Sequence, residues 1–260
     1  MVDSSLTIKI LGSGTSTGVP VVGCSCGVCH STEVRNRRTR CSALVSWGGY
    51  NILIDTSPDL RQQSLDHGIR WVDAVLYTHR HADHVHGIDD LRVLNPNHDQ
   101  PLPVYGSAEM MQHLTQCFSY VFKPRDRALF RPRLDAVVLS SPVTLFGRTV
   151  EPLSLLHGDE RVFGYRIGSM AYLTDCSAIP AAAQARLGNL KLLVLDGLRF
   201  RSHPTHFTVA QAIAVAAQLQ AERVVLTHLS HDVDYAVHNE QLPDNIEFAY
   251  DGLTVTLNDS

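Results

Sequence analysis

The sequence Thr-His-Arg-His-Ala-Asp-His at residues 78–84 constrains this chain more than any other segment. It directly follows a short apolar run that is typical of a buried strand. Side chains two residues apart point to the same side of an extended segment, so His79 and His81 face the same way. Asp83 and His84 follow where the chain turns, and they are placed to face a second metal ion. The spacing therefore predicts a metal site at the end of this strand.

Three further residues of metal-ligand type, His157, Asp175 and His228, each come directly after an apolar, β-prone run. A sheet presents the residues at its strand ends along one edge, so we expect these three to join the cluster at 78–84. Asp55 also ends a predicted strand, and two interpretations remain open for it. It is either a partner that orients a ligand histidine or a residue at the start of a helix.

The chain has six cysteines, and three of them lie within six positions of each other: Cys24, Cys26 and Cys29. Thiols spaced in this way are typical of metal ligands, and a loop without a core of its own is commonly closed by a structural zinc. Candidates for the fourth ligand are His30, Cys41 and His231. We favour His231, because it lies three residues past His228 and would connect the loop to the predicted metal site.

The composition indicates a globular protein. With 260 residues, of which 44% are hydrophobic and 18% charged, the chain can form a substantial core, and we expect a single domain over residues 1–260. No apolar stretch approaches the roughly 20 residues of a membrane span. The first residues lack the basic and apolar regions of a secretory signal, so we expect a cytoplasmic protein without a membrane partner. The formal net charge of −4 argues against a surface that coats nucleic acid.

Periodicity predicts the main elements. The predicted strands are 7–11, 43–47, 51–55, 149–156, 162–167, 170–174, 191–196 and 223–227. The predicted helices are 60–67, 107–118 capped by Ser107, and 208–220 capped by Thr208. The tail 248–257 is predicted to be a hairpin with a type I′ turn at Asp-Gly. Segment 119–136, rich in arginine, reads as a solvated connection, with a substrate-covering flap as the alternative.

His-x-His-x-Asp-His after a strand resembles the signature of the metallo-β-lactamase superfamily of hydrolases. Three further features resemble one subgroup, the PhnP-like cyclic phosphodiesterases: the opening 11–20 followed by Cys-x-Cys-x-x-Cys, the segment 37–42, and the segment 226–231 with its two histidines. The resemblance covers residues 6–257. It extends more weakly to ribonuclease Z, whose long tRNA-binding arm has no obvious counterpart in this sequence. It implies an α/β (α+β) fold, a four-layer αββα metallo-β-lactamase sandwich.

The resemblance also implies a set of ligands. One metal would be held by His79, His81, His157 and Asp175, and the second by Asp83, His84, Asp175 and His228, so that Asp175 bridges two divalent ions, zinc or manganese. A structural zinc would be held by Cys24, Cys26, Cys29 and His231. Related proteins that reduce oxygen or nitric oxide carry glutamate where this chain has His81, which favours hydrolysis.

By the same resemblance, we expect a metal-dependent phosphodiesterase in which a hydroxide activated by two metals attacks a small, cyclic or linear, phosphodiester. Asp83 and His206 are the expected catalytic residues, with His206 as the general acid and His203 as its rival. The partner would be a small molecule rather than nucleic acid, and the resembled families favour a homodimer. Alternatives are a hydrolase of a thioester, lactone or β-lactam, a tRNA 3′-processing nuclease, and a scaffold with purely structural metals.

Overall fold

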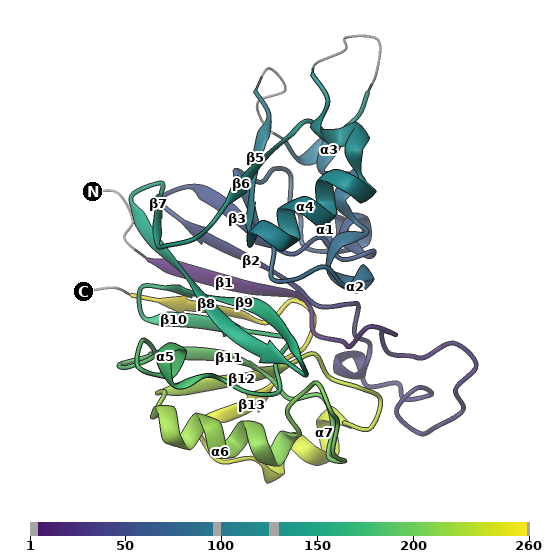
Figure 1. The fold of residues 1–260 in the computed structure, drawn as a ribbon. Helices are drawn as coiled ribbons and strands as arrows, with labels where there is room; N and C mark the ends of the chain where they lie inside the picture. The colour runs from purple at the N-terminus through teal and green to yellow at the C-terminus, as the bar shows by residue number, and fades with distance from the viewer. Residues whose placement is uncertain (1–4, 96–99, 125–129, 259–260) are drawn as a thin grey trace.

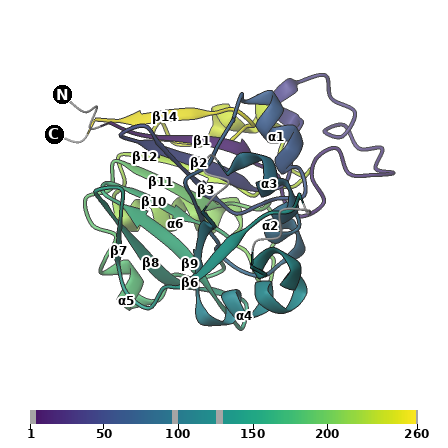
Figure 2. The ribbon, with the colours of Figure 1, turned by 90° about the horizontal axis from the view of Figure 1, so that it is seen from above.

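The computed structural model describes residues 5–95, 100–124 and 130–258. Over these residues the chain forms two seven-stranded sheets that pack face to face, with helices on their outer faces (Figures 1 and 2). This arrangement confirms the four-layer αββα sandwich. The single domain expected for residues 1–260 stays a prediction.

The first sheet has the strand order β14-β1-β2-β3-β4-β5-β6. Its strands are β1 (Leu6–Gly12), β2 (Ser42–Trp47), β3 (Tyr50–Ile54), β4 (Ala74–Leu76), β5 (Leu102–Gly106), β6 (Leu134–Val138) and β14 (Thr254–Leu257). Pairing is antiparallel from β14 to β3 and parallel from β3 to β6. Figure 2 shows β14 beside β1 at one edge.

The second sheet has the order β13-β12-β11-β10-β9-β8-β7. Its strands are β7 (Val143–Leu145), β8 (Arg148–His157), β9 (Glu160–Ile167), β10 (Met170–Leu173), β11 (Leu192–Asp196), β12 (Arg223–Thr227) and β13 (Ile246–Phe248). Pairing is antiparallel from β7 to β10 and parallel from β10 to β13. In both sheets the parallel strands end at the same rim of the sandwich, and the predicted ligands lie at this rim.

Helices cover the outer face of each sheet (Figure 1). Those near the first sheet are α1 (Leu60–Asp66), α2 (Ala82–Val85), α3 (Leu91–Leu94), α4 (Ala108–Cys117) and the 3₁₀ turns η2 (Ile88–Asp90) and η3 (Ser119–Phe122). The remaining ones are α5 (Ala181–Gln184), α6 (Val209–Leu219), α7 (Tyr235–His238), η1 (Val34–Asn36) and η4 (Asn239–Gln241). Both predicted caps are confirmed: Ser107 accepts from the backbone of α4, and Thr208 forms a capping box with Gln211. No described helix has the length and apolar composition that crossing a bilayer requires.

Burial on both faces explains the continuous apolar sequence of β11. Leu192 and Val194 belong to the core between the two sheets, whereas Leu193 and Leu195 pack with the helices outside the second sheet. Parallel strands covered on both sides characteristically read as unbroken apolar runs. Only the last residue of the strand, Asp196, is charged, and it lies at the rim.

The hairpin predicted for the tail 248–257 is wrong. β13 pairs with β12 in the second sheet and β14 pairs with β1 in the first, so the turn carries the chain from one sheet to the other. Of the two turn residues only Gly252 has a positive φ, whereas a type I′ turn needs two. The reason is tertiary: the Asp251 carboxylate accepts hydrogen bonds from the backbone and hydroxyl of both Ser13 and Thr39.

The predicted connection 119–136 is more regular at its ends than the sequence suggested. It begins as η3 and finishes in the edge strand β6. Its residues 125–129, with Arg125 and Arg127, lie outside the described residues.

Candidate metal centre

Strands of both sheets deliver polar side chains to one rim of the sandwich. The residues at or just beyond these strand ends are Asp55, His79, His81, Asp83, His84, His157, Asp175, Asp196 and His228. β3 and β4 of the first sheet supply the residues up to 84, and β8, β10, β11 and β12 of the second sheet supply the others. The rim therefore depends on both sheets, as the order of the apolar runs predicted.

One group at the rim consists of His79, His81, His157 and Asp175, whose candidate ligand atoms all lie within 4.8 Å of one another. Nε2 of His79 lies 2.9 Å from Nδ1 of His81 and 3.6 Å from a carboxylate oxygen of Asp175. Three imidazoles and one carboxylate directed at a common point make a donor set suited to a divalent transition metal.

A second group consists of Asp83, His84, Asp175 and His228, again with all ligand atoms within 4.8 Å. Nε2 of His84 and of His228 lie 3.3 and 3.2 Å from the same oxygen of Asp175. Both nitrogens are buried and have no hydrogen-bond partner among residues 5–95, 100–124 and 130–258. Leaving a buried polar atom unpaired costs about 1–3 kcal/mol, and a cation at this point would satisfy both. The residues thus fit a pair of metals that share Asp175.

Hydrogen bonds outside the two groups fix several imidazoles. Nδ1 of His84 lies 2.7 Å from Oδ2 of Asp55. The hydroxyl of Thr78 donates to the same oxygen, and the backbone N–H of Thr78 donates to Oδ1 of Asp55. Nδ1 of His157 lies 2.7 Å from the carbonyl oxygen of Thr205. A proton held on Nδ1 leaves Nε2 free as a ligand. Of the two interpretations left open for Asp55, the orienting partner is the one that these contacts support; the helix α1 begins after Asp59 instead.

Burial and neighbouring charge set the ionisation of the groups. Burial holds the pKa of His79 well below its ordinary value, so its imidazole is neutral, the form that binds metal. Burial alone would raise the pKa of Asp175, but the surrounding histidines, His228 and His84 first, lower it well below the ordinary value. The shared carboxylate is therefore ionised.

His206, the predicted general acid, lies against the metal-ligand groups. Its ring stacks on His228 with centroids 4.7 Å apart and meets His157 edge-on at 4.6 Å. Nδ1 of His206 lies 2.6 Å from Oδ2 of Asp196. The rival His203 lies farther out, with its ring 5.0 Å from that of His206.

Asp196 was not predicted from the sequence. It is fully buried and also accepts a hydrogen bond of 2.9 Å from the backbone of Cys176. Burial alone would lower the pKa of His206, but the charge of Asp196 and the hydrogen bond to it raise that pKa. The signal that could have found Asp196 is the one that identified Asp55: a carboxylate at the end of a wholly apolar strand.

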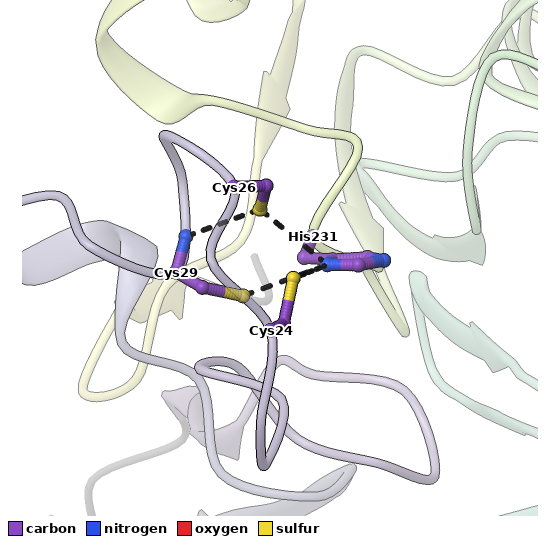
Figure 3. A group of neighbouring side chains, drawn as sticks. All are labelled: Cys24, Cys26, Cys29 and His231. Atoms are coloured by element: carbon purple, nitrogen blue, oxygen red, sulfur yellow. Dashed lines mark hydrogen bonds between the residues drawn. The ribbon is translucent and has the colours of Figure 1, made fainter.

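The side chains of the predicted cysteine group come together in the structure (Figure 3), and its His231 lies three residues after His228. The Sγ atoms of Cys24, Cys26 and Cys29 lie 3.2, 3.5 and 3.5 Å from Nδ1 of His231. The backbone N–H of Cys29 contributes most to lowering the pKa of the Cys26 thiol to about 7, which favours the thiolate. Cys41 is buried elsewhere, 3.3 Å from the hydroxyl of Tyr172. Three thiols and one imidazole suit a tetrahedral zinc.

The hydrogen bond from His84 to Asp55 yields a direct test. Asp55→Asn keeps the shape of the side chain but removes the charge that orients His84, and loss of such a partner typically weakens metal binding about 10- to 100-fold. We expect competition with a chromophoric chelator to show this loss at one metal site. Asp66→Asn is the matched control, because Asp66 is exposed and accepts a hydrogen bond from the exposed Gln62. Unchanged affinity in Asp55→Asn would contradict the assigned role.

Comparison with known proteins agrees with the geometry. A family model described as "Beta-lactamase superfamily domain" matches residues 50–229. An octanoyltransferase of Porphyromonas gingivalis is 43% identical over 257 residues, which are 96% of this chain and 51% of that protein. The chain thus spans about half the length of this relative. Coenzyme PQQ synthesis protein B of Xanthomonas euvesicatoria is 28% identical over 240 residues, covering 75% of this chain and 74% of that one.

Solved structures extend the comparison. The crystal structure of a new diphosphatase from the PhnP family has 40% sequence identity and a TM-score of 0.91, covering 97% of both chains. The short form of human tRNase Z, with 16% identity and a TM-score of 0.68 over 96% of this chain and 98% of the other, shares the fold. From the family model, these similarities and the paired ligand groups, the chain belongs to the metallo-β-lactamase superfamily and has its fold.

Proposed function

We propose that this protein is a metal-dependent phosphodiesterase that hydrolyses a small phosphodiester. The observation that carries the proposal is the position of His206. Its ring contacts His157 of one metal-ligand group and His228 of the other, and its Nδ1 is hydrogen-bonded to Asp196. An alkoxide is a poor leaving group, so cleavage of a phosphodiester gains from an acid placed beside the reacting phosphorus. A thiolate leaves without such help, so a thioester would make little use of this pair.

Zinc or manganese ions held by the two groups would lower the pKa of a water between them and neutralise charge on the phosphate oxygens. The protein's contribution is to hold the ligands in place. Asp175 belongs to both groups, and Asp83 adds a second carboxylate on the side of His228. The cysteine group offers three sulfur atoms and one imidazole, a donor set that favours zinc.

In this proposal His206 gives its Nε2 proton to the departing oxygen. Asp196 accepts the hydrogen bond of Nδ1 and stabilises the protonated ring, so the acid is present at a higher pH than for an unpaired histidine. Because Asp196 is fully buried and held by a backbone N–H, the pair is fixed before substrate arrives. A small substrate also agrees with the formal charge of −4, which gives no general attraction for nucleic acid.

Hydrolysis of a diphosphate bond is a second candidate, favoured by the 40% identity with a structure described as a diphosphatase. The same ligand groups could serve it, because attack again occurs at phosphorus. The leaving group would be a phosphate, which needs less protonation than an alkoxide. Octanoyl transfer is not proposed, since the relative of that name is about twice the length of this chain.

An assay panel tests the proposal. Protein loaded with zinc or with manganese would be offered a bis-aryl phosphodiester, a 2′,3′-cyclic nucleotide, a ribose cyclic phosphate, a diphosphate diester, pre-tRNA, a thioester and a lactone. We expect turnover of the small phosphodiesters. Turnover of the thioester or lactone alone would reject the proposal, and turnover of the diphosphate alone would replace it with the second candidate.

Replacing the acid should have an effect that depends on the leaving group. His206→Ala is expected to lower kcat by about 10²–10⁴-fold for an alkyl phosphodiester. The loss should be much smaller for a nitrophenyl ester, whose leaving group needs no proton. His203→Ala serves as the control and should lower neither rate. Equal losses on both esters would remove His206 from the role.

Asp196→Asn should change the pH dependence. The carboxylate raises the pKa of His206, so the acid form persists to higher pH in the unaltered protein. Without that charge the pKa of His206 falls, and the alkaline limb of the kcat profile should move to lower pH. Asp232→Asn, which changes a carboxylate paired with the exposed Arg201, should leave the limb in place. A profile that keeps its shape in Asp196→Asn would contradict the pairing.

A further inference from the structure

His228 differs from the other buried candidate ligands in how its ring is held. His79, His84 and His157 each have Nδ1 hydrogen-bonded to a group outside the ligand set. Both ring nitrogens of His228 are buried, and neither has a hydrogen-bond partner in the part of the chain that the structure describes. Nε2 faces Asp175 at 3.2 Å, as a ligand should, but no side chain fixes the ring through Nδ1.

Ring stacking and the main chain must therefore position His228. The rings of His84 and His206 lie nearly parallel to it, with centroids 5.9 and 4.7 Å away. Stacking restricts the tilt of a ring but allows it to slide. The backbone of His228 has φ +60°, a left-handed conformation that is uncommon for residues other than glycine and that persists only where the surroundings impose it.

The residues after His228 are held by the beginning of the segment 13–38, which we call the cysteine loop because it carries the three thiols. Leu229 donates its N–H to the carbonyl of Ser13 at 2.8 Å and accepts from the N–H of Thr15 at 3.1 Å. The adjacent residue of the loop, Gly14, forms a parallel bridge with Leu229. The cysteine loop thus makes a short strand-like contact one residue beyond the ligand.

The far end of the cysteine loop holds the same segment. The guanidinium of Arg38, which is only 2% exposed, donates to the carbonyls of Ser230 and Val233 at 3.2 and 2.9 Å. Asn36 orients this guanidinium through a 3.0 Å bond and accepts the N–H of Tyr235. Both ends of the loop therefore converge on residues 229–235.

Between its ends the cysteine loop leaves the body of the sandwich (Figure 1). It has little core of its own: Val22 is 99% exposed and Val34 is 73% exposed. Its three thiols connect the loop to the rest of the protein, because they lie 3.2 to 3.5 Å from Nδ1 of His231 (Figure 3). A site of this kind supplies folding free energy when it binds metal.

We infer that the cysteine group acts as a positioning device for His228, so that metal bound by Cys24, Cys26, Cys29 and His231 strengthens metal binding at Asp83, His84, Asp175 and His228. Fixing the loop fixes residues 229–231, and these set the backbone from which His228 projects. Within residues 5–95, 100–124 and 130–258, no hydrogen bond joins the cysteine loop to His79, His81 or His157. Metal binding by the group that these histidines form with Asp175 should therefore change much less. The inference rests on the proposed pair of metals but not on the substrate.

The test measures metal affinity rather than activity. Cobalt(II) bound by thiolates gives an intense charge-transfer absorption that imidazole and carboxylate ligands do not give, so occupancy of the two kinds of site can be followed separately. In Cys24→Ser the charge-transfer band should disappear. The dissociation constant of one imidazole–carboxylate site, measured against a competing chelator, should rise about tenfold or more, the scale typical of lost orienting contacts. The other site should keep its affinity.

Cys117→Ser is the matched control, because Cys117 is exposed and outside the group, and it should change neither site. If Cys24→Ser does not fold, an organomercurial that strips metal from the thiols of Cys117→Ser provides the same comparison without further substitution. If Cys24→Ser leaves the metal affinity of both imidazole–carboxylate sites unchanged, or weakens both equally, the inference is overturned but the proposed function is not. A parent protein that binds metal at its cysteines only overturns the proposed function as well.

Discussion

The shared carboxylate of Asp175 is the constraint around which the rim of the sandwich is organised. It is 2% exposed, and a buried anion is costly unless cations or hydrogen bonds surround it. His79 and His84 reach it from the first sheet and His228 from the second. Metals bound here would tie the two sheets together at this rim, so folding and metal binding should be linked.

The architecture of the sheets brings these residues together with few requirements on the sequence. Parallel strands buried on both faces need only apolar residues along their length, and their ends fall at a common rim. β11 illustrates the division: four apolar residues fill the two cores and the fifth, Asp196, is presented to the site. Ligands can thus be contributed by distant segments without disturbing the core, since each lies at or just beyond the end of its strand.

Most of the site was predictable from the sequence, because a ligand residue after an apolar run is a local signal. The choice of His231 over His30 or Cys41 also followed from its closeness in sequence to His228. Asp196 was not predicted, although it ends an apolar strand as Asp55 does, because its role depends on His206, which only the fold places beside it. The hairpin prediction for the tail was wrong for a related reason. The Asp-Gly sequence indicates a tight turn, but whether the strands on either side of it pair with each other depends on the distant strands that compete for them.

Two carboxylate–histidine pairs at this rim have similar hydrogen-bond distances, but their histidines have different surroundings. Asp55 holds His84 at 2.7 Å and Asp196 holds His206 at 2.6 Å. Nε2 of His84 is buried, lacks a partner in the described chain and points at Asp175, so only a cation can use it. His206 is also largely buried, at 8% exposure against 0% for His84, and its ring stacks on that of His228. In the proposed function its Nε2 faces the substrate. In the proposed function the same device, an imidazole fixed through Nδ1, would serve as a ligand in one pair and as an acid in the other, according to what its Nε2 faces.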